Sequence, residues 1–311
     1  MSEYPRTLLE FERRFETEEA CRAYLIEVRW PEGFRCPRCG HPDTWSASRG
    51  RLVCRRCQHQ TWVTAGTVFH RSHEPLRIWF RAIWWVTNQK TGMSAVGLQR
   101  ALGLGSYRTA WMMLHKLRRA MVRPGRERLT GEVEVDDIYV GGVEPGVHGR
   151  ETLTKAIVVI AAEVKGRGMG RIRLQHVPDV SARSLVGFVQ AAVEPGGLVR
   201  TDGWEGYAPL RARGYRHRVR IAPDRAAASR LLPRVHRVAS LLKRWLLGTH
   251  QGRVELKHLQ RYLDEYAFRF NRRTSRHRGM LFFRVLEHAV ALPPTPYRQV
   301  VQERRPESHK I

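Results

Sequence analysis

The pattern of apolar and polar positions changes along the chain from helical spacing to several strand-like runs. Runs rich in Val, Ile and other apolar residues predict strands at residues 131–142, 155–164, 171–177, 197–201 and 215–221. A helix with a Ser cap is predicted at 181–193, a short helix precedes the last strand, and Pro233 begins a helix that ends at Gly248. The order β-β-β-α-β-α-β followed by helices predicts a mixed sheet flanked by helices.

The earlier part of the chain is predicted to be mainly helical. Apolar residues recur at helical spacing in residues 8–29, 75–90, 93–102 and 106–121. A glycine turn at 103–105 joins the last two of these helices, which is the pattern of a helix-turn-helix. The second helix would be the recognition helix, with Tyr107, Arg108 and Thr109 facing a DNA groove. An ordinary helical hairpin is the alternative.

Composition adds a strong positive charge. The 311 residues include 55 Lys and Arg against 29 Asp and Glu, which gives a formal net charge of +26. These cations are spread over the whole length and favour a polyanion, with DNA or RNA first and an anionic membrane surface as the rival. No apolar run approaches the length of about 18 residues that a spanning helix needs. Because residues 1–14 also lack the apolar core of a signal peptide, we expect a cytoplasmic protein, associated with the nucleoid when bound to DNA.

Four of the five cysteines form two CxxC pairs, Cys36 with Cys39 and Cys54 with Cys57. Each pair makes a tight knuckle, and four thiolates can ligate one tetrahedral zinc ion. A redox dithiol does not explain two pairs, so the spacing predicts a structural zinc ribbon. Arginines flank both knuckles, and they either contact phosphates or form a solvated basic face.

Carboxylates in two predicted strands are candidates for a second metal site. Asp136 and Asp137 lie within an apolar strand, where a charged pair is costly unless a cation neutralises it. Asp202 follows another short strand, at the end where α/β sheets bind ligands. Two acids from separate strands can hold hard divalent cations. The alternatives are a solvated Asp on an open strand face and an Asp202 that caps the helix near Trp204.

Together the motifs resemble those of bacterial transposases of the insertion-sequence 1595 family, a branch of the DDE superfamily. The resemblance is carried by an ordered series: RWPEGFRCPRCG at 29–40, GTVFHRSHEPLRIWF at 66–80, VDDIYVGG at 135–142, RTDGWEGY at 200–207, SLLKRWLLGTHQG at 240–252 and LKHLQRYLDEYAFRFNRR at 256–273. The resemblance implies a multidomain α+β protein with a zinc ribbon, a helix-turn-helix and a ribonuclease H-like α/β catalytic domain with a mixed sheet. The expected boundaries are 1–70 for the N-terminal helix and zinc ribbon, 71–122 for the helix-turn-helix region, 123–130 for a linker, 131–292 for the catalytic domain and 293–311 for a basic tail.

The family pattern also assigns the metal ligands residue by residue. It makes Asp136 the first ligand and Asp202 the second, while Asp137 occupies a place where relatives often have Glu. Relatives often carry a Glu ligand where this chain has His236, so the chain looks like the DDH variant of the family. Imidazole is a softer ligand than a carboxylate, and Mg²⁺ favours oxygen. Acidic residues nearby are the alternative third ligands: Glu255, Asp264 and Glu265.

The implied function is a transposase that cleaves DNA at insertion-sequence ends and transfers the strand into target DNA, with Mg²⁺ or Mn²⁺ as catalytic cofactor and Zn²⁺ as structural cofactor. The partner is double-stranded DNA, on which a homo-oligomer is expected. Candidate phosphate contacts are Lys243, Arg244 and the arginine-rich segment 211–220. A sequence-specific DNA-binding regulator derived from a transposase is the alternative function, and a nuclease acting on RNA ranks third.

Overall fold

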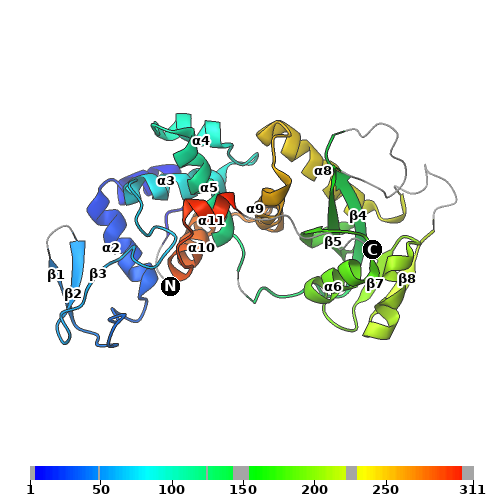
Figure 1. The fold of residues 1–311 in the computed structure, drawn as a ribbon, viewed down its shortest axis with the longest axis horizontal. Coiled ribbons are helices and arrows are strands. Elements are labelled where there is room, and N and C mark those ends of the chain that lie inside the picture. The colour runs from blue at the N-terminus through cyan, green and yellow to red at the C-terminus, as the bar shows by residue number, and fades with distance from the viewer. Residues whose placement is uncertain (1–3, 48–49, 124, 143–153, 222–229, 303–311) are drawn as a thin grey trace. The chain divides into compact units, whose positions relative to one another are not determined.

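The computed structural model describes residues 4–47, 50–123, 125–142, 154–221 and 230–302. Within these residues the chain forms two compact units (Figure 1). The first unit contains residues 4–123 together with 275–302, and the second contains residues 125–274. Residues 143–153 and the outer part of the predicted basic tail, 303–311, lie outside the described residues.

The first unit combines helices with a small sheet. Its helices are α1 (Leu8–Arg14), α2 (Glu18–Arg29), α3 (Leu76–Asn88), α4 (Ala95–Leu102), α5 (Tyr107–Ala120), α10 (Arg278–Ala291) and α11 (Tyr297–Val301). The prediction of a single helix over 8–29 is wrong, because Phe15 leaves helical geometry and the Thr17 side chain accepts the backbone N–H of Ala20. That hydrogen bond caps a new helix.

An aromatic core holds the helices of the first unit together. The ring of Phe282 on α10 lies 5.3 Å from Phe11, 5.6 Å from Phe15 and 5.5 Å from Phe80, measured between centroids. Aromatic rings in such edge or tilted pairs add about 0.5–1.5 kcal/mol each to the stabilisation from burial. Helix α10 therefore packs on residues that lie between 202 (Phe80) and 271 (Phe11) positions earlier, although the sequence analysis placed it in one domain with residues 131–274. Its apolar stripe at helical spacing does not say which core receives it.

The helix pair expected at 93–121 is present as α4 and α5. Ser94 caps α4 by accepting the N–H of Gly97, and Ser106 caps α5 by accepting the N–H of Arg108. Gly103 ends α4 with φ 63° and ψ 33°, a left-handed conformation that favours glycine. The sequence signals for these two helices and for their turn are therefore confirmed as local structure.

The small sheet of the first unit contains three antiparallel strands, β1 (Thr44–Ala47), β2 (Arg51–Cys54) and β3 (Gln60–Trp62), in that order. The two CxxC pairs lie at its ends: Cys39 precedes β1, and Cys54 is the last residue of β2.

The second unit contains a five-stranded mixed sheet, as predicted. Its strands are β4 (Glu132–Val140), β5 (Ala156–Lys165), β6 (Gly168–Val177), β7 (Leu198–Thr201) and β8 (Arg216–Val219), in the spatial order β6-β5-β4-β7-β8. The pairs β4–β5 and β5–β6 are antiparallel, whereas β4–β7 and β7–β8 are parallel. A parallel pair needs a crossover connection, here through β5, β6 and a helix.

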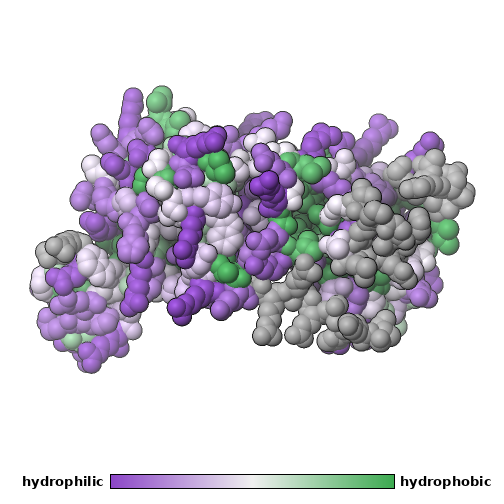
Figure 2. Space-filling model, turned by 45° about the horizontal axis from the view of Figure 1, so that its top comes forward, coloured by the Kyte–Doolittle hydropathy of each residue, from purple (hydrophilic) through white to green (hydrophobic). Residues whose placement is uncertain are grey.

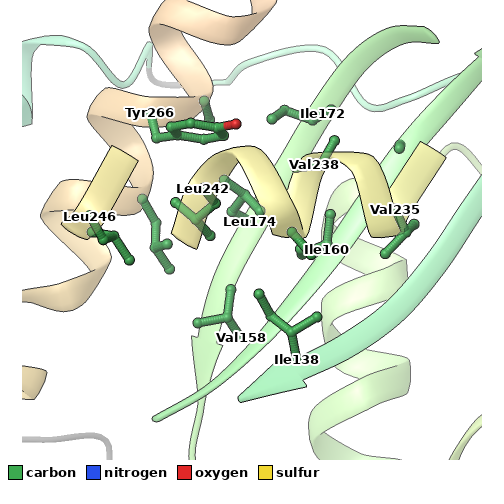
Figure 3. Close-up of a cluster of buried hydrophobic side chains, with 14 of the residues drawn as sticks. Ile138, Val158, Ile160, Ile172, Leu174, Val235, Val238, Leu242, Leu246 and Tyr266 are labelled. Atoms are coloured by element: carbon green, nitrogen blue, oxygen red, sulfur yellow. The ribbon is translucent and has the colours of Figure 1, made fainter. Parts of the chain in front are cut away.

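Helices cover both faces of this sheet. One face packs on α8 (Pro233–His250) and α9 (Leu259–Asn271), which follows the short turn η3 (Leu256–His258) (Figure 3). The other face packs on α6 (Ala182–Ala192) and the 3₁₀ helix η2 (Glu205–Arg213). Val238 and Leu242 of α8 are fully buried in the core between the sheet and helices α8 and α9, which also contains Ile160 of β5. Burying each such side chain stabilises the fold by about 1.5–3 kcal/mol.

Hydrophilic side chains dominate the face of the molecule seen in Figure 2, and the apolar ones form small scattered groups. Across the described chain, no helix has both the length and the apolar character that crossing a bilayer requires.

Candidate active site

Strand β4 carries its adjacent acids on opposite faces of the sheet. Ile138 belongs to the core under α8, whereas Val135 belongs to the core under α6. Because side chains alternate along a strand, Asp136 shares the α8 face with Ile138, and Asp137 shares the α6 face with Val135. Both aspartates are 8% exposed. Asp136 is therefore the acid that can meet a residue of α8.

The parallel pairing of β4 with β7 brings the second aspartate to the same place. The last pair in this register joins Glu134 to Arg200. Asp136 and Asp202 each follow two residues later, where β7 ends. Neighbouring strands lie about 4.8 Å apart, so the register carries the two aspartates to matching positions on adjacent segments.

His236 approaches this place from the first turns of α8. Its Nε2 atom lies 3.9 Å from Oδ2 of Asp136. The Asp136 side chain is 12% exposed and the His236 side chain is 38% exposed. The carboxylate therefore lies under the helix, while the imidazole remains open to solvent and to a ligand.

A residue that the sequence analysis missed fixes the start of α8. Glu134 is fully buried, and its carboxylate accepts the backbone N–H groups of Arg234 at 2.7 Å and Val235 at 3.2 Å. The carboxylate also accepts a hydrogen bond from Nη1 of Arg234 at 2.8 Å. The residue before the helix, Leu232, has no capping side chain. Glu134 thus caps α8 from the neighbouring strand and satisfies N–H groups that a helix start leaves unpaired.

This cap also sets the position of the candidate ligands. Asp136 follows Glu134 by two residues on β4, and His236 follows Arg234 by two residues on α8. The guanidinium of Arg234 continues to the carbonyl oxygens of Gly168 at 3.0 Å and Gly166 at 2.7 Å. Arg234 therefore links the start of α8 to strand β4 and to the β5–β6 turn.

The surroundings of Asp202 show one of the two roles considered for it. One carboxylate oxygen accepts the N–H of Trp204 at 3.1 Å, so the residue does cap the turn that follows β7. The neighbouring Thr201 hydroxyl donates to the carbonyl of Asp202 and lies 2.8 Å from Nε2 of His217. Burial, and then the Arg211 charge, lower the pKa of His217 below its usual value.

The donor set suits divalent cations, provided that more than one ion is bound. In the part of the chain that the structure describes, the four cysteines form the one group of three or more potential ligands whose donor atoms lie within 4.8 Å of one another. Asp136, Asp202 and His236 therefore span a wider space. Two-metal sites hold their cations about 3.5–4 Å apart, so the ligands of such a site do not all have to meet at one point.

The alternative acids have other partners. Glu255 pairs with Lys257 at 2.8 Å, and Asp264 accepts Nε2 of Gln260 at 3.0 Å. Glu265 is fully buried on α9 and pairs with Arg269 at 3.4 Å. Burial raises the pKa of Asp264 to about 6, against a smaller opposing effect of its hydrogen bond to Gln260. These contacts stabilise α9 and the turn before it.

The cysteines form a separate and tighter site. The Sγ atoms of Cys36 and Cys57 lie 3.6 Å apart, as do those of Cys39 and Cys54. Tetrahedral zinc with Zn–S bonds of about 2.3 Å needs sulfur atoms just under about 4 Å apart. The four thiols therefore fit one structural zinc ion. Cys21 is buried in α2 outside this group, as expected for a core residue.

Both cysteine knuckles have the same backbone geometry. The N–H of Cys36 donates to the carbonyl of His41, and the N–H of Cys54 donates to the carbonyl of His59. The fifth residue of each knuckle has positive φ, 72° at Gly40 and 56° at Gln58. The backbone alone therefore turns each pair of thiols toward one point.

The predicted DNA-contacting residues are exposed to different degrees. Tyr107 is 51% exposed at the start of α5, whereas the guanidinium of Arg108 stacks on Tyr297 at 3.8 Å from the ring centroid. Thr109 is half-buried. Lys243 and Arg244 are both exposed on α8. Arg211, Arg213, Arg216, Arg218 and Arg220 are exposed around η2 and β8.

Comparison with known proteins identifies two regions of the chain. Residues 128–271 match the ISXO2-like transposase domain, and residues 16–60 match the transposase zinc-ribbon domain. These matches cover more than half of the chain. A protein of transposable element ISH50 from Halobacterium salinarum, described as uncharacterized, is 29% identical over 143 residues. That similarity spans 45% of this chain and 46% of the relative, so the match covers about half of each protein.

Proposed function

Because the chain belongs to the insertion-sequence 1595 family of transposases, we propose that it is a DNA transposase that cuts DNA at insertion-sequence ends and joins the released strand to target DNA. The observation that carries this proposal is that β4, β7 and α8 meet at the candidate ligands. The β4–β7 register aligns Asp136 with Asp202, and α8 sets His236 3.9 Å from Asp136. In this reading the second unit is a ribonuclease H-like catalytic domain with a DDH ligand set.

The three side chains would hold Mg²⁺ or Mn²⁺. Asp136 and Asp202 would supply oxygen ligands and His236 a nitrogen ligand to these cations. When bound, such cations stabilise the negative charge that develops on the attacked phosphate and on the leaving oxygen. The two carboxylates and the imidazole would hold and position those cations, and no side-chain nucleophile is required.

DNA binding would use surfaces on both units. Helices α4 and α5 would act as a helix-turn-helix, with Tyr107 outermost at the N-terminus of the recognition helix. Exposed Lys243 and Arg244 lie on the same helix as His236 and would contact phosphates close to the scissile bond. The net charge of +26 supports a polyanionic partner.

A plasmid excision assay with candidate ends tests the activity, and purified His236→Ala tests the ligand set. We expect wild-type protein to cut and join, and His236→Ala to lose strand transfer in Mg²⁺ while it still binds the ends. His236→Glu should retain some transfer and prefer Mg²⁺ more strongly, since an oxygen ligand replaces nitrogen. Ser240→Ala, an exposed position on α8, is the matched control and should behave as wild type.

Two outcomes would contradict the proposal in different ways. Wild-type transfer rates for His236→Ala in both Mg²⁺ and Mn²⁺ would remove His236 from the site and direct attention to Glu255, Asp264 and Glu265. End binding without excision by the wild-type chain would favour the DNA-binding regulator instead.

A further inference from the structure

A cavity of about 540 Å³ lies within the first unit, beside the N-terminal half of α5. One of its walls is a single face of that helix, formed by residues that recur three or four positions apart: Arg108, Thr109, Met112, Met113 and Lys116. The other walls are residues 70–74, Trp79 and residues 294–297. Ligand pockets in proteins typically measure about 300–1,000 Å³, so this space can hold a small molecule or one unit of a polymer.

The lining of the cavity is strongly basic. It includes five basic residues and one acid: His70, Arg71, His73, Arg108 and Lys116, with Glu74. Throughout the described residues, no carboxylate forms an ion pair with Arg71, Arg108 or Lys116. Burial, and then the charge of Arg119, lower the pKa of Lys116. An anion entering the cavity would therefore relieve unbalanced positive charge.

Two of these cations lie against aromatic rings. The Arg108 guanidinium is 3.8 Å from the centroid of Tyr297, and Nζ of Lys116 is 5.7 Å from that of Trp79. Methionine and proline side chains complete the apolar part of the wall. Such a lining offers a flat apolar surface next to positive charge, and this combination matches a ligand with a planar ring and an anionic group.

The segment 70–74, which lines the cavity, contains an uncommon backbone conformation. Arg71 has φ 50°, in the left-handed region that L-residues other than Asn, Asp and Gly rarely adopt. Nδ1 of the adjacent His70 accepts the N–H of Gly66 at 3.2 Å, which leaves Nε2 as the donor of the neutral ring. Strained residues of this kind cluster at ligand-binding sites.

We propose that this cavity receives one extrahelical nucleotide of the bound DNA, with its phosphate against Arg71, Arg108 and Lys116 and its base against the aromatic and methionine wall. The inference rests on the proposed function only in taking DNA as the polymer. It assigns a different task to the predicted recognition helix, because Arg108 and Thr109 then contact a nucleotide taken out of the base stack. Extrusion costs a few kcal/mol, and contacts to the flipped base repay it.

Saturation-transfer NMR with thymidine 5′-monophosphate measures the binding directly, without any cleavage. We expect transfer to the base protons with wild-type protein, and a Kd at least about tenfold higher for Lys116→Gln, the effect of losing one charge-assisted hydrogen bond. Thr109→Trp, which fills the cavity and removes no charge, should abolish the signal. Arg100→Gln removes an exposed cation of α4 that does not line the cavity, and it should bind as wild type.

Thermal melting of each variant shows whether it is folded, and Lys116→Gln keeps the test decisive if Thr109→Trp does not fold. Absence of transfer with wild-type protein, or equal transfer with Lys116→Gln and Arg100→Gln, would overturn the nucleotide site. Such a result leaves end binding and excision as separate measurements, so the site can fail while the transposase function stands. Conversely, a chain that binds thymidine 5′-monophosphate but excises no plasmid element keeps the site and loses the proposed function.

Discussion

The cysteine site and the carboxylate–histidine site are built in opposite ways. Each cysteine knuckle spans a few consecutive residues, and its own backbone hydrogen bonds turn the thiols inward. The carboxylate–histidine site takes one residue from each of three segments that are spread over a hundred positions, from Asp136 to His236. Local geometry therefore completes the first site, whereas the second depends on strand register and helix docking. The two sites should respond differently when a single supporting residue is removed.

The largest expected effect concerns the cysteine site. Cys54→Ser should lose zinc and unfold the segment around β1–β3, because a structural zinc ion supplies about 10–16 kcal/mol of apparent binding free energy. The sheet of the second unit should remain folded. Metal content per chain and limited proteolysis measure the two effects. Cys21→Ser is the control, since this buried thiol lies outside the cluster; zinc-free wild-type protein would contradict the ribbon.

The next effect is catalytic and separates two adjacent acids. Asp136→Asn should lower strand cleavage by at least about a hundredfold, the size of losing one preorganised electrostatic group, and should leave end binding unchanged. Asp137→Asn is the matched control, because its side chain faces α6 on the other side of the sheet. Cleavage rates and a DNA-binding titration distinguish the roles. Equal losses of cleavage in the two variants would show that activity does not depend on which face of the strand carries the acid.

A smaller effect is expected for the cap that positions α8. Glu134→Gln should destabilise the second unit by about 1.5–3 kcal/mol, because three hydrogen bonds lose a charged acceptor, and should lower cleavage as His236 shifts. Glu132→Gln changes a partly exposed acid of the same strand, paired with Arg200, and should cost less than about 1 kcal/mol. Urea unfolding gives the free energies. Full cleavage by Glu134→Gln would show that the cap serves stability alone.

The smallest effect is a pH dependence near Asp202. The pKa of His217 is lowered in the folded protein, so below its usual value of about 6.5 the unfolded chain takes up a proton that the folded chain resists. Stability should therefore fall as the pH drops from about 7.5 to about 5.5, and His217→Asn should weaken that dependence. Melting temperatures at both pH values test this. An unchanged difference would mean that His217 does not contribute.

Much of this organisation is readable from the sequence, where signals are local. Ser94, Ser106 and Gly103 mark the helix ends, and the CxxC spacing marks the knuckles, because each acts within a few residues. The break between α1 and α2 is not readable from apolar spacing alone, since the stripe continues across Phe15. The cap from Glu134 is missed for another reason: a residue on a strand satisfies a helix that begins a hundred positions later.

The same distinction between local and long-range signals applies to the candidate active site. Asp136 and Asp202 are identifiable as strand-borne acids, but only the parallel register aligns them, and a register depends on the whole sheet. The family resemblance selects Asp136 over Asp137, and the two cores of the sheet place these aspartates on opposite faces. His236 is identified by family resemblance, and its distance to Asp136 comes from the docking of α8.

The return of α10 to the first unit has a consequence for how the protein is made. The second unit is inserted between residues 123 and 275, so Phe11, Phe15 and Phe80 leave the ribosome long before Phe282. Their aromatic surface stays open while some 150 intervening residues are synthesised, at rates of about 5–20 residues per second. The inserted sheet can fold in that interval, and the N-terminal helices complete their core last. During synthesis, the growing chain is therefore most exposed to aggregation and to chaperones at its N-terminal end.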